Sequence, residues 1–110
     1  MTKICKNYSE ALTLLNGRKS RKVAGNTVLS LNDKGDIDLT FHQTKIITYF
    51  KDGGHDLFSG GYRTVTTKRR MNQFTRCQIV QRRGAWYVNG QPFVEGMVLN
   101  HGSIYNVSEV

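Results

Sequence analysis

The order of apolar and polar residues along this chain predicts a series of short β-strands. In residues 36–42 every second residue is apolar. Because successive side chains of a strand point to opposite faces, this segment is predicted to be a half-buried antiparallel strand. Residues 28–31 form a shorter apolar strand before it. Residues 45–51 are richer in Ile, Tyr and Phe, so that strand is expected to be central or buried on both faces.

Turn-forming residues separate these strands and indicate further ones. Asn-Asp-Lys-Gly at 32–35 and Asp-Gly-Gly at 52–54 are typical turn sequences, and Asn89-Gly90 is a strong signal for a type I′ hairpin. Another hairpin turn is expected at Arg83-Gly84. The remaining strands are predicted at residues 55–58, 79–80, 86–88, 93–99 and 104–107.

The N-terminal region shows helical spacing instead. Apolar residues recur at helical intervals in 8–15, after a capping candidate at Asn7 or Ser9. An Asn-Gly pair at 16–17 is expected to end this helix. The connector at 18–22 is strongly basic and is expected to lead into the strands.

A second helix is predicted over residues 66–74, where hydroxyl residues can cap its start. Met71 and Phe74 share one face, with Val65 just before it, and these residues are expected to dock on the sheet. The opposite, solvent-facing side is predicted to carry Arg69, Asn72, Gln73 and Arg76. The predicted fold is α+β: one small single domain over residues 1–110, mostly antiparallel β-sheet with two short helices.

The composition agrees with one folded domain. The 110 residues are 38% hydrophobic and 22% charged, which is typical of a globular protein. No apolar run approaches the ~20 residues that span a membrane, and the start lacks the apolar core of a signal peptide. Cys5 and Cys77 lie far apart without metal-ligand spacing, so we expect free thiols in a reducing cytoplasm.

Charge is distributed unevenly, with a net charge of +8. Between Asp56 and Glu95 there is no acidic residue at all. The stretch contains seven basic residues: Arg63, Lys68, Arg69, Arg70, Arg76, Arg82 and Arg83. Such one-sided charge creates a positive field that attracts polyanions, so nucleic acid is the partner that the sequence favours.

The Gly60-Gly61 loop before the second helix is a candidate phosphate site. A glycine-rich loop that runs into a helix N-terminus presents backbone N–H groups and a partial positive charge. Thr66, Thr67 and Lys68 would add donors, although the spacing is not that of a Walker loop. The alternative is a tight turn followed by a helix cap. Basic residues at 68–70, in what is expected to be the first helical turn, oppose the helix dipole and favour an external anion.

Further candidate contacts alternate basic and aromatic residues. Arg63, Arg82 and Arg83 stand beside Tyr62, Trp86 and Tyr87 in the sequence. Trp86 is expected in the core, which places Tyr87 on the other face of its strand as a base-stacking candidate. Arg69 and Arg76 complete the predicted phosphate-contacting set. The basic connector at 18–22 is equally consistent with a phosphate track and with a solvated loop.

Three histidines, His42, His55 and His101, raise the question of catalysis. Two histidines and a lysine can cleave RNA by general acid–base chemistry, but no spacing brings these residues together. His42 and His55 lie near predicted turns and are expected to be exposed. The sequence therefore predicts a protein that is not an enzyme, with no cofactor and no metal.

Several segments resemble a family of small proteins found in tailed bacteriophage genomes. The most distinctive is Ser-Gly-Gly-Tyr-Arg-Thr-Val-Thr-Thr-Lys-Arg-Arg-Met-Asn at 59–72, in which Tyr62 replaces an expected Trp. The other matching segments are 25–29, 39–49, 84–88 and 92–97. The resemblance covers most of the chain and implies a phage protein acting in the host cytoplasm. It implies no catalytic or binding residue.

Three functional hypotheses follow. The first is a phage accessory protein that binds nucleic acid, DNA or RNA, without catalysis. The second is an inhibitor that binds an acidic host protein of defence or metabolism, and the third is a pocket for a nucleotide messenger. Self-association is left open. Salt-dependent binding to generic nucleic acid would distinguish the first hypothesis from salt-tolerant capture of one host protein.

Overall fold

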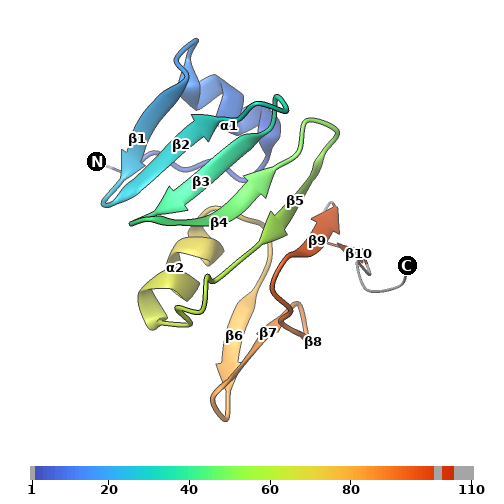
Figure 1. Cartoon of the computed structure of the whole chain (residues 1–110). Helices are drawn as coiled ribbons and strands as arrows, with labels where there is room; N and C mark the ends of the chain where they lie inside the picture. The colour runs from blue at the N-terminus through green and yellow to red at the C-terminus, as the bar shows by residue number, and fades with distance from the viewer. Residues whose placement is uncertain (1, 101–102, 106–110) are drawn as a thin grey trace.

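The computed structural model describes residues 2–100 together with the backbone of 103–105. Within these residues, seven strands form one antiparallel sheet in the order β1-β2-β3-β4-β5-β9-β10, and β6, β7 and β8 form a second, smaller sheet (Figure 1). The elements are α1 (Tyr8–Leu15), β1 (Ser20–Ala24), β2 (Thr27–Leu31), β3 (Ile37–Phe41), β4 (Thr44–Tyr49), β5 (Gly54–Leu57), α2 (Val65–Gln73), β6 (Ile79–Arg82), β7 (Ala85–Val88), β8 (Gln91–Pro92), β9 (Met97–Asn100) and β10 (Ser103–Tyr105). The fold is α+β with mostly antiparallel sheet, as predicted.

Strands β1 to β5 follow one another as a chain of hairpins. The predicted alternation in β3 is confirmed, because Ile37, Leu39 and Phe41 are buried and the residues between them are partly exposed. Leu39 pairs with Leu29 on one side and with Ile47 on the other. This row of apolar pairs crosses the sheet and forms the centre of the core.

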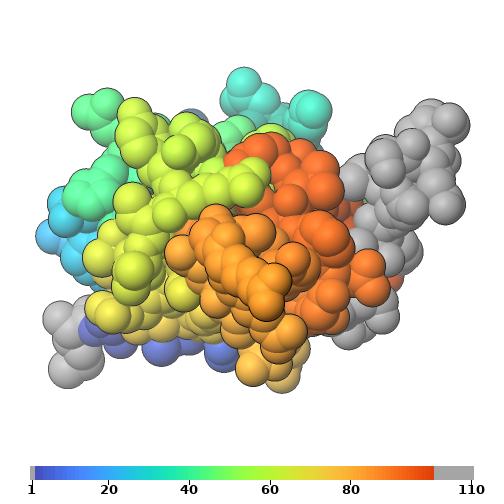
Figure 2. Space-filling model, turned by 90° about the horizontal axis from the view of Figure 1, so that it is seen from below, coloured from blue at the N-terminus to red at the C-terminus, as the bar shows by residue number. Residues whose placement is uncertain are grey.

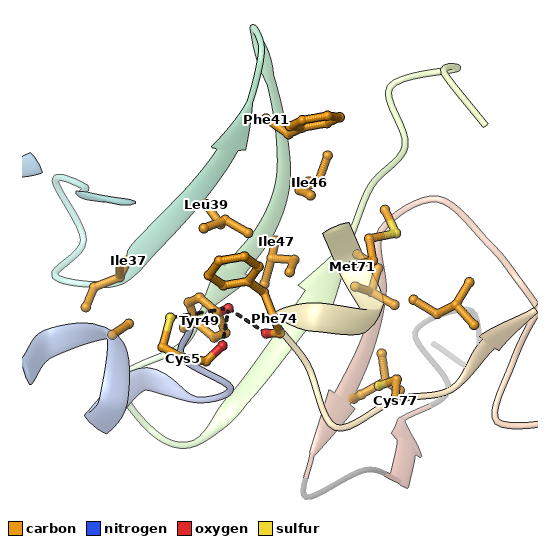
Figure 3. Packing of buried hydrophobic residues seen from close by; sticks show 14 of the residues in the cluster. Cys5, Ile37, Leu39, Phe41, Ile46, Ile47, Tyr49, Met71, Phe74 and Cys77 are labelled. Atoms are coloured by element: carbon orange, nitrogen blue, oxygen red, sulfur yellow. Dashed lines mark hydrogen bonds between the residues drawn. The ribbon is translucent and has the colours of Figure 1, made fainter. Parts of the chain in front are cut away.

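Strand β4 lies between β3 and β5, so its predicted central place is confirmed. A register shift lets Leu39 pair with Ile47 while Thr40 pairs with Lys45, which leaves Ile46 without a partner in β3. Such a bulge turns two successive side chains toward the same side of a strand. Ile46 therefore points toward Phe41 and joins the core beside Ile47 (Figure 3).

Helix α1 has the predicted bounds, and Asn7 rather than Ser9 caps it. The Asn7 side chain accepts a hydrogen bond from the N–H of Glu10 at 2.8 Å, and the Glu10 carboxylate accepts one from the N–H of Lys6 at 2.8 Å. This pair is a variant of the capping box in which the Glu10 carboxylate binds the N–H of Lys6, one residue before the cap. Asn16 ends the helix in the left-handed conformation with φ 51°.

Helix α2 buries Met71 and Phe74 completely, as predicted, but the expectation for Val65 is wrong. Val65 is the first residue of α2 and is 57% exposed. Residues four and three apart share a helix face, so the face that carries Met71 and Phe74 also carries Thr67, which is buried. Val65 lies off that face.

The core joins the N-terminal segment, the main sheet and the end of α2. The Tyr49 hydroxyl donates to the carbonyl oxygen of Phe74 at 2.6 Å and receives a contact from the Cys5 thiol at 3.7 Å (Figure 3). Cys5 and Cys77 are both free and buried, as predicted. Burial raises the pKa of Cys5 to about 11, so this thiol stays protonated at neutral pH.

Two segments differ from their predicted form. The connector at 18–22 is not a loop throughout, because β1 begins at Ser20 and pairs with β2. Its exposed basic residues suit a strand at the edge of a sheet, where charge discourages pairing with another chain. The strand predicted at 93–99 begins only at Met97, because Glu95 and Gly96 turn the chain toward the loop after β5.

Residues 58–96, called the insert segment below, leave the main sheet after β5 and return to it as β9. The two ends of this segment meet, since Leu57 pairs with Met97 and the N–H of Gly96 donates to the carbonyl of Leu57 at 2.7 Å. The insert segment carries α2 and the small sheet, both below the main sheet in Figure 1. The predicted turns at Arg83-Gly84 and Asn89-Gly90 form its two hairpins, with all four residues at positive φ.

Candidate functional site

The Gly60-Gly61 loop is held by an acidic residue from the far end of the insert segment. The carboxylate of Glu95 accepts hydrogen bonds from the N–H of Ser59 at 2.7 Å and from the Ser59 hydroxyl. Arg63 approaches the same carboxylate at 3.4 Å. Burial alone would raise the pKa of Glu95, but the hydrogen bonds from Ser59 and the charge of Arg63 outweigh it and lower this pKa.

This arrangement favours the alternative of a tight turn at the loop, while the phosphate site predicted there stays a prediction. The donors of buried Ser59 already bind a carboxylate of the same chain, and the N–H of Gly61 donates to the Ser59 hydroxyl at 3.2 Å. Gly60 has φ 63°, and a Cβ there would lie 2.6 Å from Cγ2 of Thr44. Gly60 therefore permits a close approach to β4, which is the structural role of a tight turn.

The start of α2 also departs from the predicted anion site. The Thr64 hydroxyl caps the N–H of Thr67, and the Thr67 side chain is buried. Arg69 and Arg70 lie beyond the first turn because α2 begins at Val65, and Arg70 belongs to the last turn. A cation in the last turn is favoured by the helix dipole, so the predicted conflict does not arise for Arg70, whereas Lys68 lies in the first turn.

A groove runs between α2 and the turns of two hairpins of the main sheet. It has two adjoining parts of about 800 and 380 Å³ that share Asn26, Phe41, His42 and Thr66. None of the described residues that line it is acidic. Its polar and aromatic side chains include Asn26, His42, Gln43, Tyr62, Thr64, Thr66, Arg69 and Arg70.

Specific contacts fix the wall of the groove on the sheet side. The N–H of His42 donates to the carbonyl of Asn26 at 2.7 Å, which joins the two turns, and both residues have positive φ. The His42 ring centroid is 4.4 Å from that of Phe41. The guanidinium of Arg70 lies 5.2 Å from the Phe41 ring centroid and donates to the carbonyl of Gly25 at 3.3 Å. Arg70 therefore ties α2 to the sheet.

The structure brings together only some of the predicted site residues. Thr66 and Arg69 line the groove, Lys68 lies beside them on α2, and the Gly60-Gly61 loop leads into it through Tyr62. Arg82 and Arg83 are exposed at the tip of the β6–β7 hairpin. Figure 2 shows this hairpin in orange beside the yellow-green loop and helix, so both belong to one face of the molecule.

Three of the predicted site residues do not line the groove. Arg63 lies 5.0 Å from the Phe93 ring centroid and faces Glu95 instead of the groove. Arg76 follows the end of α2 and lies 4.0 Å from Glu10 of α1, so its expected place beside Arg69 on one helix face is wrong. Tyr87 is partly exposed opposite buried Trp86, as the alternation predicted.

The groove also contains two residues that sequence reasoning missed, Asn26 and His42, and a third, Tyr62, that it named only as a neighbour of basic residues. Asn26 and His42 lie at turns that are adjacent only because β1, β2 and β3 pair as neighbours. Tyr62 is 65% exposed and lines the groove. Its place among basic residues was the one signal for it in the sequence.

The two histidines that the structure describes, His42 and His55, do not form a catalytic pair. His42 is exposed as predicted, but His55 is buried, with Nε2 3.8 Å from the Cys77 thiol, so its expected exposure is wrong. Burial lowers the pKa of His55 and raises that of Cys77, which opposes a thiolate–imidazolium pair. The register of β4 places His42 and His55 at opposite ends of that strand. His101 lies outside the described residues.

No three His, Cys, Asp or Glu side chains in the part of the chain that the structure describes gather into a metal-binding group. Neither α1 nor α2 has the length and apolar character of a membrane-crossing helix.

Comparison with known proteins identifies the family. A family model described as Kyanoviridae Gp96 protein, from a family of tailed phages, matches residues 1–101. No curated protein and no solved structure matches the chain. The match covers nearly the whole sequence and confirms the predicted relationship to phage proteins. The chain thus belongs to the Kyanoviridae Gp96 protein family.

Proposed function

We propose that this phage protein binds nucleic acid without catalysing a reaction, and that it acts in the host cytoplasm. The observation that carries the proposal is the groove beside α2, whose described lining residues include two arginines and no acidic side chain. A polyanion can enter such a groove without meeting a like charge. The acid-free stretch of the sequence extends this positive character to the β6–β7 hairpin.

The basic residues of this face suit phosphate groups. Arg69 is exposed at the groove, and Arg82 and Arg83 are exposed at the hairpin tip. No ion pair within the described part of the chain neutralises any of the three. Contacts of this kind position a strand but read little sequence. We therefore expect affinity that depends strongly on salt and weakly on sequence.

A host protein is the second candidate partner. Three exposed side chains of the insert segment favour it, namely Tyr62 at 65%, Val65 at 57% and Val94 at 54% exposure. Aromatic and apolar side chains next to arginines are typical of protein interfaces. In this case the protein would inhibit an acidic protein of host defence or metabolism.

Fluorescence anisotropy over a salt series tests the first proposal. The double change Arg82→Ala and Arg83→Ala should weaken binding similarly for different sequences and lower the salt slope by about one unit per lost phosphate contact. The matched control is Lys34→Ala with Lys51→Ala, which removes the same charge from exposed turns of the main sheet. The control should leave the slope nearly unchanged.

Two results would contradict this assignment. An equal loss of slope in both double variants would mean that net charge, rather than this face, determines binding. Absence of binding to every probe at low salt would exclude nucleic acid. Affinity capture from host lysate, with and without nuclease, would then identify a protein partner by its resistance to nuclease.

A further inference from the structure

We propose that the groove beside α2 holds an unpaired base, so that the protein prefers single-stranded nucleic acid to duplex. This inference rests on the proposed function and adds the class of ligand. It is carried by the kinds of side chain that meet in the groove. These residues come from two hairpin turns of the main sheet and from the segment that leads into α2.

Aromatic rings are available on both sides of the groove. Tyr62 is 65% exposed on the side of the loop. On the sheet side, the exposed His42 ring packs against Phe41 with centroids 4.4 Å apart. Every base has an apolar face that stacks on such rings, whatever its sequence.

The groove also offers hydrogen-bonding groups suited to the edge of a base. Asn26 and Gln43 carry amides, which both donate and accept, and Thr66 adds a hydroxyl. In duplex the base edges are paired and the faces are stacked on their neighbours. Only an unpaired base can therefore present its face to Tyr62 and its edge to Asn26.

The charge of the groove fits a nucleotide better than a neutral aromatic ligand. Arg69 lines the part of the groove next to Asn26 and His42, where it can meet the phosphate that accompanies the base. Arg70 is already held by the side chain of Gln73 at 2.8 Å and by the carbonyl of Gly25. Arg69 is thus the phosphate contact and Arg70 a fixed part of the wall.

The contacts of His42 keep this arrangement preformed. Its backbone hydrogen bond to Asn26 and its positive φ of 58° place the imidazole at the groove without any rearrangement of the two hairpins. A non-glycine residue in this conformation is uncommon and often marks a functional position. A preformed site loses less entropy when it binds a flexible single strand.

The test uses a short single-stranded oligonucleotide containing 2-aminopurine, and the same sequence as a duplex. Fluorescence anisotropy should give tighter binding to the single strand. Tyr62→Ala should weaken that binding by about tenfold, as expected for one lost stack, whereas Tyr62→Phe should keep it. The fluorescence of 2-aminopurine should fall on binding to the native protein and to Tyr62→Phe, but not to Tyr62→Ala. Circular dichroism checks that each variant is folded.

The outcomes separate this inference from the proposed function. Equal affinity for single strand and duplex, or a 2-aminopurine signal that falls as much with Tyr62→Ala as with the native protein, would overturn the base site while nucleic-acid binding through the hairpin arginines stands. If the salt slope still responds to Arg82→Ala with Arg83→Ala, only the base site has failed. Failure to bind either probe would overturn both proposals together.

Discussion

The contact between Glu95 and Ser59 gives the sharpest test of how the insert segment is held. Changing Glu95 to Gln keeps the size of the side chain and removes its charge. The carboxylate accepts from both the N–H and the hydroxyl of Ser59, which is completely buried. The amide has only one oxygen to accept with, and its NH₂ group would face a donor.

The magnitude follows from the hydrogen bonds that are lost. A hydrogen bond to a charged group contributes about 1.5–3 kcal/mol, and a buried donor left without an acceptor costs about 1–3 kcal/mol. The Glu95 side chain is 36% exposed, so water can partly replace the lost acceptor. We therefore expect Glu95→Gln to lower the free energy of unfolding by about 2 kcal/mol and the Tm by roughly 8–15 °C.

The pH dependence supplies a second, independent readout. Because the pKa of Glu95 is lowered in the folded protein, its stabilising effect is complete above its ordinary value of 4.5 and is lost as the pH falls through the lowered pKa. The native protein and Glu95→Gln should therefore differ most at pH 7 and converge in acid. Urea melts between pH 3 and pH 8 measure this directly.

A matched control is Asp33→Asn, which removes one negative charge from an exposed turn. Its free energy of unfolding should stay within about 0.5 kcal/mol of the native value. The reasoning is refuted if Glu95→Gln is as stable as the control at pH 7. It is also refuted if the loss of stability in Glu95→Gln is the same at every pH.

Three further predictions concern the core and its titrating groups. Phe74→Ala should cost about 3–5 kcal/mol because the ring is fully buried under the sheet; a neutral effect in denaturant melts would contradict the packing of α2. Burial raises the pKa of Asp56 from 3.8 to about 6, which favours its protonated form, so the folded state loses stability as the pH rises from 4 through 6. Asp56→Asn should therefore raise the free energy of unfolding at pH 7.5 by about 1–3 kcal/mol and leave it unchanged near pH 4. Equal gains at both pH values would show that the buried charge of Asp56 is not the cause. A reducing agent should leave the Tm unchanged because both thiols are free, whereas a fall of more than about 5 °C would reveal a disulfide.

Local patterns in the sequence predicted most of the helices and strands. A few neighbouring residues decide the alternation in 36–42, the helix cap at Asn7 and the turn pairs at 83–84 and 89–90. Each of these features is found in the structure. Errors arose where distant contacts decide the outcome. Residues 20–22 form a strand because β2 is there to pair with them, and Val65 is exposed because Thr67 takes the face toward the core.

The candidate site depended still more on distant contacts. The basic stretch was visible in the sequence. Its loop, however, is held by Glu95, which lies at the opposite end of the insert segment from Ser59. The groove exists because strand pairing places the turns at Asn26 and His42 side by side. No local pattern indicates either contact, and for that reason the sequence predicted the charge of the surface better than its shape.

The position of the insert segment between two paired strands has a consequence for folding. Strands β1 to β5 can pair through short hairpins as soon as they are synthesised. The free edge of β5 must wait for β9, which follows the insert segment in the sequence. Closing so long a loop is slow, and an unpaired strand edge invites pairing with another chain. During this interval the unfinished chain ends in a segment with basic residues and no acidic ones between Asp56 and Glu95. Repulsion between these segments opposes the association of incomplete copies, so we expect the one-sided charge to protect the open edge of the sheet as well.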